Sequence, residues 1–146
     1  MHRQYAVEGA AAALGRLGEQ ADIVILTNVG PEHQAARVAQ LQAVGMDYPV
    51  IGSRGPKGGP VAQLIAERAP SLTFFIDDLP QHHGSVAQET RGVWRLHMVA
   101  EPAIAGKIGP ARRAHARIDD WAAAEQWIAE RISGNAAAPE MEGTTS

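Results

Sequence analysis

Three groups of residues in this sequence have side chains suited to binding phosphate and a divalent metal ion. They are the adjacent Thr27 and Asn28, the single Lys57, and the carboxylate pair Asp77 and Asp78. A hydroxyl and a backbone amide can hold phosphate oxygens, and a lysine at a helix N-terminus adds its charge to the free N–H groups there. Paired carboxylates are hard oxygen ligands of the kind that Mg²⁺ takes from proteins.

The segments that must position these residues alternate between helical and extended patterns. Apolar residues spaced by three or four positions predict helices, at residues 7–20, 31–44, 57–70, 84–90 and 119–132. Short apolar runs predict strands, at residues 23–27, 48–52, 72–77 and 92–99. Pro31 suits a helix start, Gly45 suits a helix end, and Asp119 or Asp120 is placed to cap the last helix.

Strands that are apolar throughout are covered on both faces, which is typical of a parallel sheet with helices on either side. The sequence therefore predicts a three-layer α/β/α, Rossmann-like sandwich with a mainly parallel sheet. Ligands of such folds bind at the carboxyl ends of the strands. Because Thr27, Asn28, Asp77 and Asp78 all stand at predicted strand ends, we expect them to meet at one edge of the sheet, together with Lys57.

Length, charge and composition limit the organisation of the protein and its partners. The 146 residues predict one α/β domain over residues 1–133 and a disordered tail over residues 134–146. With a net charge of −3 and no dense cluster of cations, neither nucleic acid nor a membrane surface is an expected partner. The absence of cysteine excludes disulfides, zinc thiolates and a cysteine nucleophile. No segment resembles a signal peptide or a membrane span, and a cytoplasmic location is predicted.

The order of the three groups resembles the haloacid dehalogenase (HAD) superfamily, which consists mostly of Mg²⁺-dependent phosphatases with a Rossmann-like sheet. Its second, third and fourth motifs are a strand ending in Thr or Ser, a later Lys, and a strand ending in an acidic pair. The resemblance covers about residues 7–99. It implies a small phosphorylated substrate, with Thr27 and the amide of Asn28 on the phosphate oxygens, Lys57 neutralising charge, and Asp77 and Asp78 holding Mg²⁺.

The order of the groups also separates this family from two alternatives. A receiver domain carries the same residue types on a similar sheet, but there the acidic pair comes first and the Lys comes last. The stretch GPKGG around Lys57 does not have the Gly-Lys-Ser or Gly-Lys-Thr of a Walker loop, so a nucleotide-binding P-loop is not expected.

The first motif of the family has no counterpart in this chain. That motif is an apolar strand ending in Asp-x-Asp, and no acidic residue before Thr27 ends an apolar strand. In the family this strand lies between those that correspond to the Thr27 and Asp77 strands, and its first Asp is the nucleophile. Without it no aspartyl-phosphate forms, and the remaining carboxylates hold Mg²⁺ weakly. We therefore expect an N-terminally incomplete domain without a cap, inactive or nearly so, with an exposed sheet edge that favours homo-oligomers.

Two other functions fit the same residues: a non-catalytic phosphate-binding or scaffold protein of this fold, and a dehalogenase. Taken singly, Lys57 would be a solvated side chain, and the acidic pair with Pro80 would be an ordinary turn. His82 and His83 are expected at a helix start or on the surface, where one imidazole could tune the site. His97 is expected to be packed within a strand, and the basic run of residues 112–117 to form a solvated face.

Overall fold

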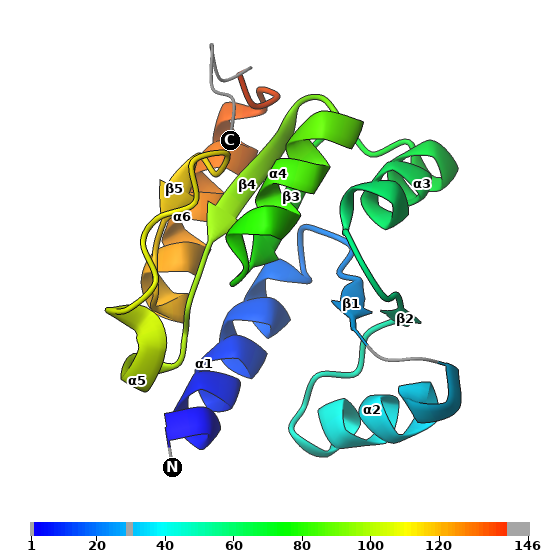
Figure 1. Ribbon diagram of the computed structural model, residues 1–146, viewed down its shortest axis with the longest axis vertical. Coiled ribbons are helices and arrows are strands. Elements are labelled where there is room, and N and C mark those ends of the chain that lie inside the picture. The colour runs from blue at the N-terminus through cyan, green and yellow to red at the C-terminus, as the bar shows by residue number, and fades with distance from the viewer. Residues whose placement is uncertain (1, 29–30, 140–146) are drawn as a thin grey trace. The chain divides into compact units, whose positions relative to one another are not determined.

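The computed structural model describes residues 2–28 and 31–139, with the side chains of residues 9–28 and 32–139. The chain forms two compact units, residues 1–55 and residues 56–146 (Figure 1). Every strand pair described is parallel, and helices alternate with strands along most of the chain. The predicted α/β class with parallel strands is therefore confirmed, while a single three-layer sheet of the HAD type stays a prediction.

The first unit consists of α1 (His2–Leu17), β1 (Ile25–Thr27), α2 (Pro31–Ala43) and β2 (Val50–Gly52). Helix α1 buries Ala10, Ala13 and Leu17, which share one helical face. Ala10 and Leu17 are buried as the sequence pattern predicts, whereas Leu14, expected on the same face, is only partly buried. Strands β1 and β2 pair with Thr27 opposite Gly52. The strand β1 is shorter than the apolar run that contains it, because its pairing with β2 begins only at Ile25.

The second unit contains the larger sheet. Its elements are α3 (Gly58–Arg68), β3 (Thr73–Asp77), α4 (Pro80–Glu89), β4 (Val93–His97), α5 (Pro102–Ala105), β5 (Ala116–Arg117) and α6 (Trp121–Gly134). The strand order is β3-β4-β5. The register places Asp77 beside His97 and His97 beside Arg117, so three polar residues form a row at the carboxyl ends of the strands.

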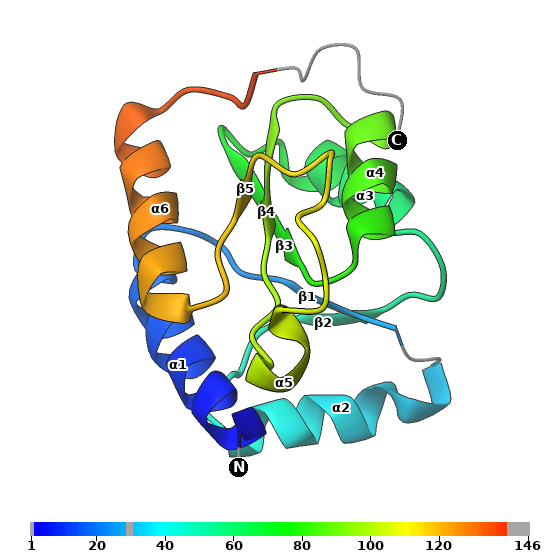
Figure 2. The same cartoon turned by 60° about the vertical axis from the view of Figure 1, so that its left-hand side comes forward.

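Helices cover both faces of this sheet (Figure 2). On one face Trp127 of α6 packs against Phe74 and Trp94, with ring centroids 6.3 Å and 5.7 Å apart. On the other face His83 of α4 packs against Phe75, with centroids 5.2 Å apart. Successive residues of a strand point to opposite faces, so the continuous apolar run of β3 supplies both layers. The prediction that this strand is covered on both sides is confirmed.

The C-terminal segment after α6 differs from the prediction. The Asp120 side chain caps α6 as expected, since it accepts the N–H of Ala122 at 3.0 Å. Residues 135–139, however, which the sequence assigned to a disordered tail, make hydrogen bonds with β4 and with the residue before it. The Trp94 indole N–H donates to the carbonyl of Ala136, and the N–H of Ala138 donates to the carbonyl of Gly92. Residues 140–146 lie outside the described part of the chain.

Each sheet has an unpaired edge at a strand that carries predicted site residues. Among the described residues, β1 pairs only with β2, and β3 pairs only with β4.

Within residues 2–28 and 31–139, no helix is long and apolar enough to cross a membrane.

Candidate functional site

The acidic pair lies where β3 ends and the chain turns into α4. Asp77 is half-buried and Asp78 is exposed. The Asp77 Oδ1 atom accepts the N–H of Leu79 at 2.8 Å, a turn in which an aspartate binds the backbone two residues ahead. The same oxygen lies 3.1 Å from Nδ1 of His82, in the first turn of α4. His82 thus stands at the helix start, as predicted, and also contacts the acidic pair.

The surroundings of Asp77 disfavour the charged form of its carboxyl group. Burial raises the pKa of Asp77 above its usual value, and the neighbouring carboxylate of Asp78 acts in the same direction. The hydrogen bond from Leu79 and the nearby His82 act against that rise without cancelling it. Functional sites frequently contain a carboxyl group with a raised pKa, and Asp77 is such a group at the end of a strand.

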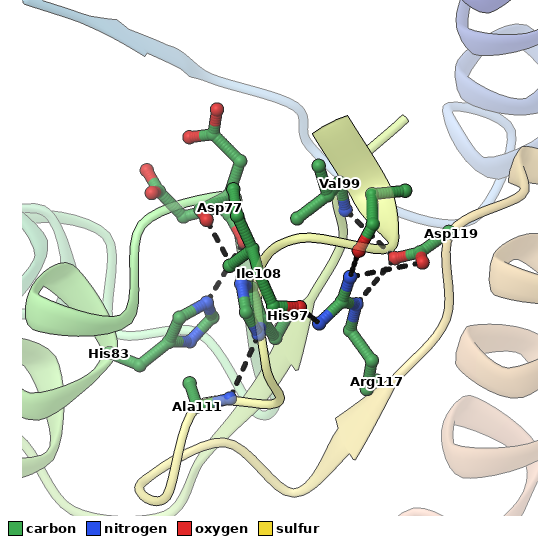
Figure 3. A network of polar contacts seen from close by, with 10 residues as sticks. Asp77, His83, His97, Val99, Ile108, Ala111, Arg117 and Asp119 are labelled. Atoms are coloured by element: carbon green, nitrogen blue, oxygen red, sulfur yellow. Dashed lines mark hydrogen bonds and ion pairs between the residues drawn. The ribbon is translucent and has the colours of Figure 1, made fainter. Parts of the chain in front are cut away.

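Two histidines contact the main chain of the acidic pair. The sequence predicts no role at the site for His97, and for His83 only that it or His82 could tune the site. His83 and His97 are both fully buried. A surface position for His83 is therefore wrong, whereas its expected place at a helix start is confirmed, since it is the fourth residue of α4. His97 is packed at the end of β4, as predicted. Figure 3 shows His83 beneath Asp77 and His97 close by. His83 Nε2 lies 3.0 Å from the Asp77 carbonyl oxygen, and His97 Nε2 lies 2.9 Å from the Asp78 carbonyl oxygen.

Lys57 directly precedes α3, as the sequence predicts. Its side chain is 2% exposed, so it is not the solvated lysine that an isolated position would suggest. The first helical N–H, that of Gly58, donates to the Ser85 hydroxyl of α4 at 2.9 Å. Only glycine fits here, because a Cβ atom on Gly58 would lie 2.3 Å from the Ser85 carbonyl oxygen. The N-terminus of α3 is therefore fixed closely against α4.

Thr27 and Asn28 lie in the first unit. Thr27 is the last residue of β1 and is buried, and its carbonyl accepts the N–H of Ser53 at 2.8 Å. Asn28 follows it and is exposed. Lys57, Asp77 and Asp78 belong to the second unit. All five residues occupy the element ends predicted for them, and their convergence on one ligand stays a prediction.

The chemistry of the acidic pair fits a weakly held Mg²⁺. Mg²⁺ keeps several waters and takes one or two carboxylates from a protein, which Asp77 and Asp78 can supply. Oδ1 of Asp77 is already an acceptor for Leu79 and His82, which leaves Oδ2 and the Asp78 carboxylate for a cation. Among the residues with described side chains, no three metal-ligating groups form a cluster.

A second polar network lies at the carboxyl end of β5. The Arg117 guanidinium donates to both carboxylate oxygens of Asp119 and to the carbonyls of Ala105 and Ile108 (Figure 3). Asp119 also accepts the N–H of Val99 at 3.0 Å. These hydrogen bonds from Arg117 lower the pKa of Asp119. Arg117 is therefore not part of a solvated face, because it binds the loop that follows β4.

Comparison of the sequence with protein families, with curated proteins and with solved structures finds no match.

Proposed function

We propose that this chain is a phosphohydrolase-type domain of the haloacid dehalogenase kind that lacks the nucleophile motif and is therefore inactive or nearly so. One observation carries the proposal. Thr27 ends β1, Asp77 ends β3, and Lys57 directly precedes α3, in the order of three of the family's motifs. The carboxyl ends of parallel strands are where α/β folds bind their ligands.

The unpaired edges of β1 and β3 also support the proposal. In the family, the nucleophile strand separates the strand that carries the Thr from the strand that carries the acidic pair. A chain without that strand would leave one edge of each neighbouring strand unpaired. Among the described residues, β1 and β3 each have one strand partner, β2 and β4 respectively.

The proposal gives each side chain a role. The Thr27 hydroxyl and the N–H of Asn28 bind phosphate oxygens, and Lys57 neutralises the charge on them. Asp77 and Asp78 hold Mg²⁺, which supplies further charge neutralisation when it is bound. The chain has no counterpart for the aspartate that attacks phosphorus in the family, so we expect ligand binding without turnover.

Calorimetric titration with inorganic phosphate, with and without Mg²⁺, tests the binding roles. We expect Mg²⁺-dependent binding that Lys57→Met and Asp78→Asn each weaken about tenfold or more, because each removes one charged contact. The matched control is Lys107→Ala, since the exposed Lys107 is the only other lysine. Unchanged binding by Lys57→Met would contradict the proposal.

Hydrolysis of an aryl phosphate in the presence of Mg²⁺ tests the predicted inactivity. We expect no rate above background, and turnover that Lys57→Met abolishes would show this expectation to be wrong. Phosphate binding of equal strength with and without Mg²⁺ would instead favour the alternative, a non-catalytic phosphate-binding protein of the same fold.

A further inference from the structure

The two buried imidazoles of His83 and His97 have no role in the proposed function so far. We propose that they are positioning residues for the acidic pair, because each binds one backbone carbonyl of Asp77 or Asp78 and so fixes the direction in which the carboxylates leave the sheet. The inference rests on the proposed function for what the carboxylates bind. The hydrogen bonds themselves do not depend on it.

The hydrogen bonds of His97 determine its protonation. Its Nδ1 atom accepts the N–H of Ala111 at 2.9 Å, and its Nε2 atom lies 2.9 Å from the Asp78 carbonyl oxygen. A backbone N–H can only donate and a carbonyl can only accept, so the ring carries one proton, on Nε2. A doubly protonated ring would lose the bond from Ala111, and the other tautomer would lose both bonds. His97 is thus a neutral bridge between the turn at Asp78 and the loop before β5.

His83 fixes the neighbouring peptide group. The Asp77 carbonyl accepts the N–H of Met98 at 3.1 Å and faces Nε2 of His83 at 3.0 Å. Two donors therefore occupy both lone pairs of this oxygen, one from the chain after β4 and one from α4. The Nδ1 atom of His83 is buried without a hydrogen-bond partner, so only its Nε2 proton contributes.

The two rings also hold each other in place. The centroids of His83 and His97 are 5.4 Å apart in an edge-to-face arrangement, and the Phe75 ring packs edge-to-face with His83 at 5.2 Å. Partners that orient metal ligands from outside typically change metal affinity 10–100-fold when they are removed. Here the orientation acts through the main chain of the acidic pair rather than through its carboxylate oxygens.

NMR of the full chain tests the inference without reference to activity. At pH 7 the imidazole nitrogen spectra should show His97 protonated on Nε2 alone. A proton on Nδ1 of His97 would overturn the proposal, because Ala111 and Asp78 could then not both be bound.

Two variants of His97 test the positioning role. His97→Leu removes donor and acceptor, whereas His97→Gln keeps one of each. We expect His97→Leu to shift the backbone amide signals of residues 77–79 and to weaken Mg²⁺ binding about tenfold or more, and His97→Gln to restore most of both. If His97→Leu does not fold, His83→Phe makes the same comparison at Asp77, because it keeps a ring and removes the donor.

His115→Leu is the matched control. The imidazole of His115 also bridges two backbone groups, since it accepts the N–H of Arg95 and faces the carbonyl of Pro139, and both of these lie outside the acidic pair. Its loss should lower stability and leave the signals of residues 77–79 in place. Wild-type signals for residues 77–79 in a folded His97→Leu or His83→Phe variant would overturn the inference. A wild-type chain without any response to Mg²⁺ would instead contradict the metal role in the proposed function, and the amide signals would still decide the positioning role.

Discussion

At the scale of single residues, His83 contributes to the dependence of stability on pH. Burial lowers its pKa from 6.5 to about 4. Between these two values the unfolded chain takes up a proton that the folded chain does not, so the unfolded state is favoured as the pH falls. The stabilising contribution is complete above pH 6.5 and is lost on the way down to about pH 4. The shift corresponds to a free energy on the order of 3 kcal/mol.

We expect His83→Phe to remove this part of the pH dependence while lowering stability at pH 7. Urea unfolding at several pH values between 7 and 4.5 measures it, and the charged or titratable neighbours His82, Arg95 and His97 are unchanged in the variant. His33→Gln, at an exposed position of α2, serves as the control and should follow the wild type. A slope as steep in His83→Phe as in the wild type would contradict the assignment.

Asp77 contributes to the pH dependence of stability in the opposite direction to His83. Its pKa is raised, mainly by burial, so the folded state favours the protonated form and loses stability as the pH rises through the titration of this carboxyl. Asp77→Asn keeps an acceptor for the N–H of Leu79 and removes the charge. We expect it to be more stable than the wild type at pH 7, by up to about 1 kcal/mol, with a smaller gain at pH 5.

Urea unfolding measures this difference, with the exposed Asp22→Asn as the control. A variant Asp77→Asn that is less stable than the wild type at pH 7 would show that the His82 contact outweighs the cost of burial.

The residues of the site differ in how far the sequence predicts them. Asp77 and Asp78 are recognisable because they end an apolar run. His83 and His97 are not, because their burial depends on backbone groups that a local sequence pattern does not identify. His83 binds the carbonyl of Asp77 across the turn between β3 and α4. His97 binds residues 14 and 19 positions away. Buried polar groups require such partners, and a single sequence does not reveal them.

At the scale of elements, the contact of α3 with α4 depends on one glycine. A Cβ atom on Gly58 would lie 2.3 Å from the Ser85 carbonyl oxygen, whereas a Cβ atom on the adjacent Gly59 meets nothing within 4 Å. We expect Gly58→Ala to destabilise the protein by about 1–3 kcal/mol through overpacking. Gly59→Ala should be neutral or stabilise it by about 0.5 kcal/mol, because alanine favours the helix.

Urea unfolding of these two variants is a matched comparison, because both place one methyl group in the same helical turn. Equal stabilities would mean that α3 and α4 are not fixed as closely as the hydrogen bond from Gly58 to Ser85 indicates.

The sequence predicts the helices that are long enough to show a period and the strands that lie in apolar runs. Helices α2, α3 and α6 appear near their predicted positions, whereas α1 begins at His2, five residues earlier than predicted, and α4 begins at Pro80, four residues earlier. α5 and β5 were not predicted. They contain four and two residues, too few for a periodic pattern, and β5 exists only through its pairing with Leu96 and His97.

At the scale of the whole molecule, the two units differ in what can stabilise them. The second unit has a three-stranded sheet with helices on both faces, whereas the sheet of the first unit has two strands of three residues each. Two-stranded sheets are marginal in water. We expect a fragment of residues 56–139 to fold by itself and a fragment of residues 1–55 to remain largely unfolded, as measured by circular dichroism and NMR signal dispersion. Dispersed signals from residues 1–55 alone would contradict this expectation.

The fold class was predictable because it follows from local alternation of helical and extended patterns. The division into two units was not, because it depends on which strands pair. Strand pairing joins residues that are far apart in sequence. Nothing in the apolar runs of β1 and β3 indicates which strands they pair with.

The aromatic packing on α6 has a practical consequence. All three tryptophans, at positions 94, 121 and 127, belong to the second unit, while both tyrosines, at positions 5 and 48, belong to the first. Excitation at wavelengths that only indole absorbs therefore gives a fluorescence signal from residues 56–146 alone. The tryptophans of the chain thus allow the unfolding of the second unit to be followed by fluorescence without attaching a dye.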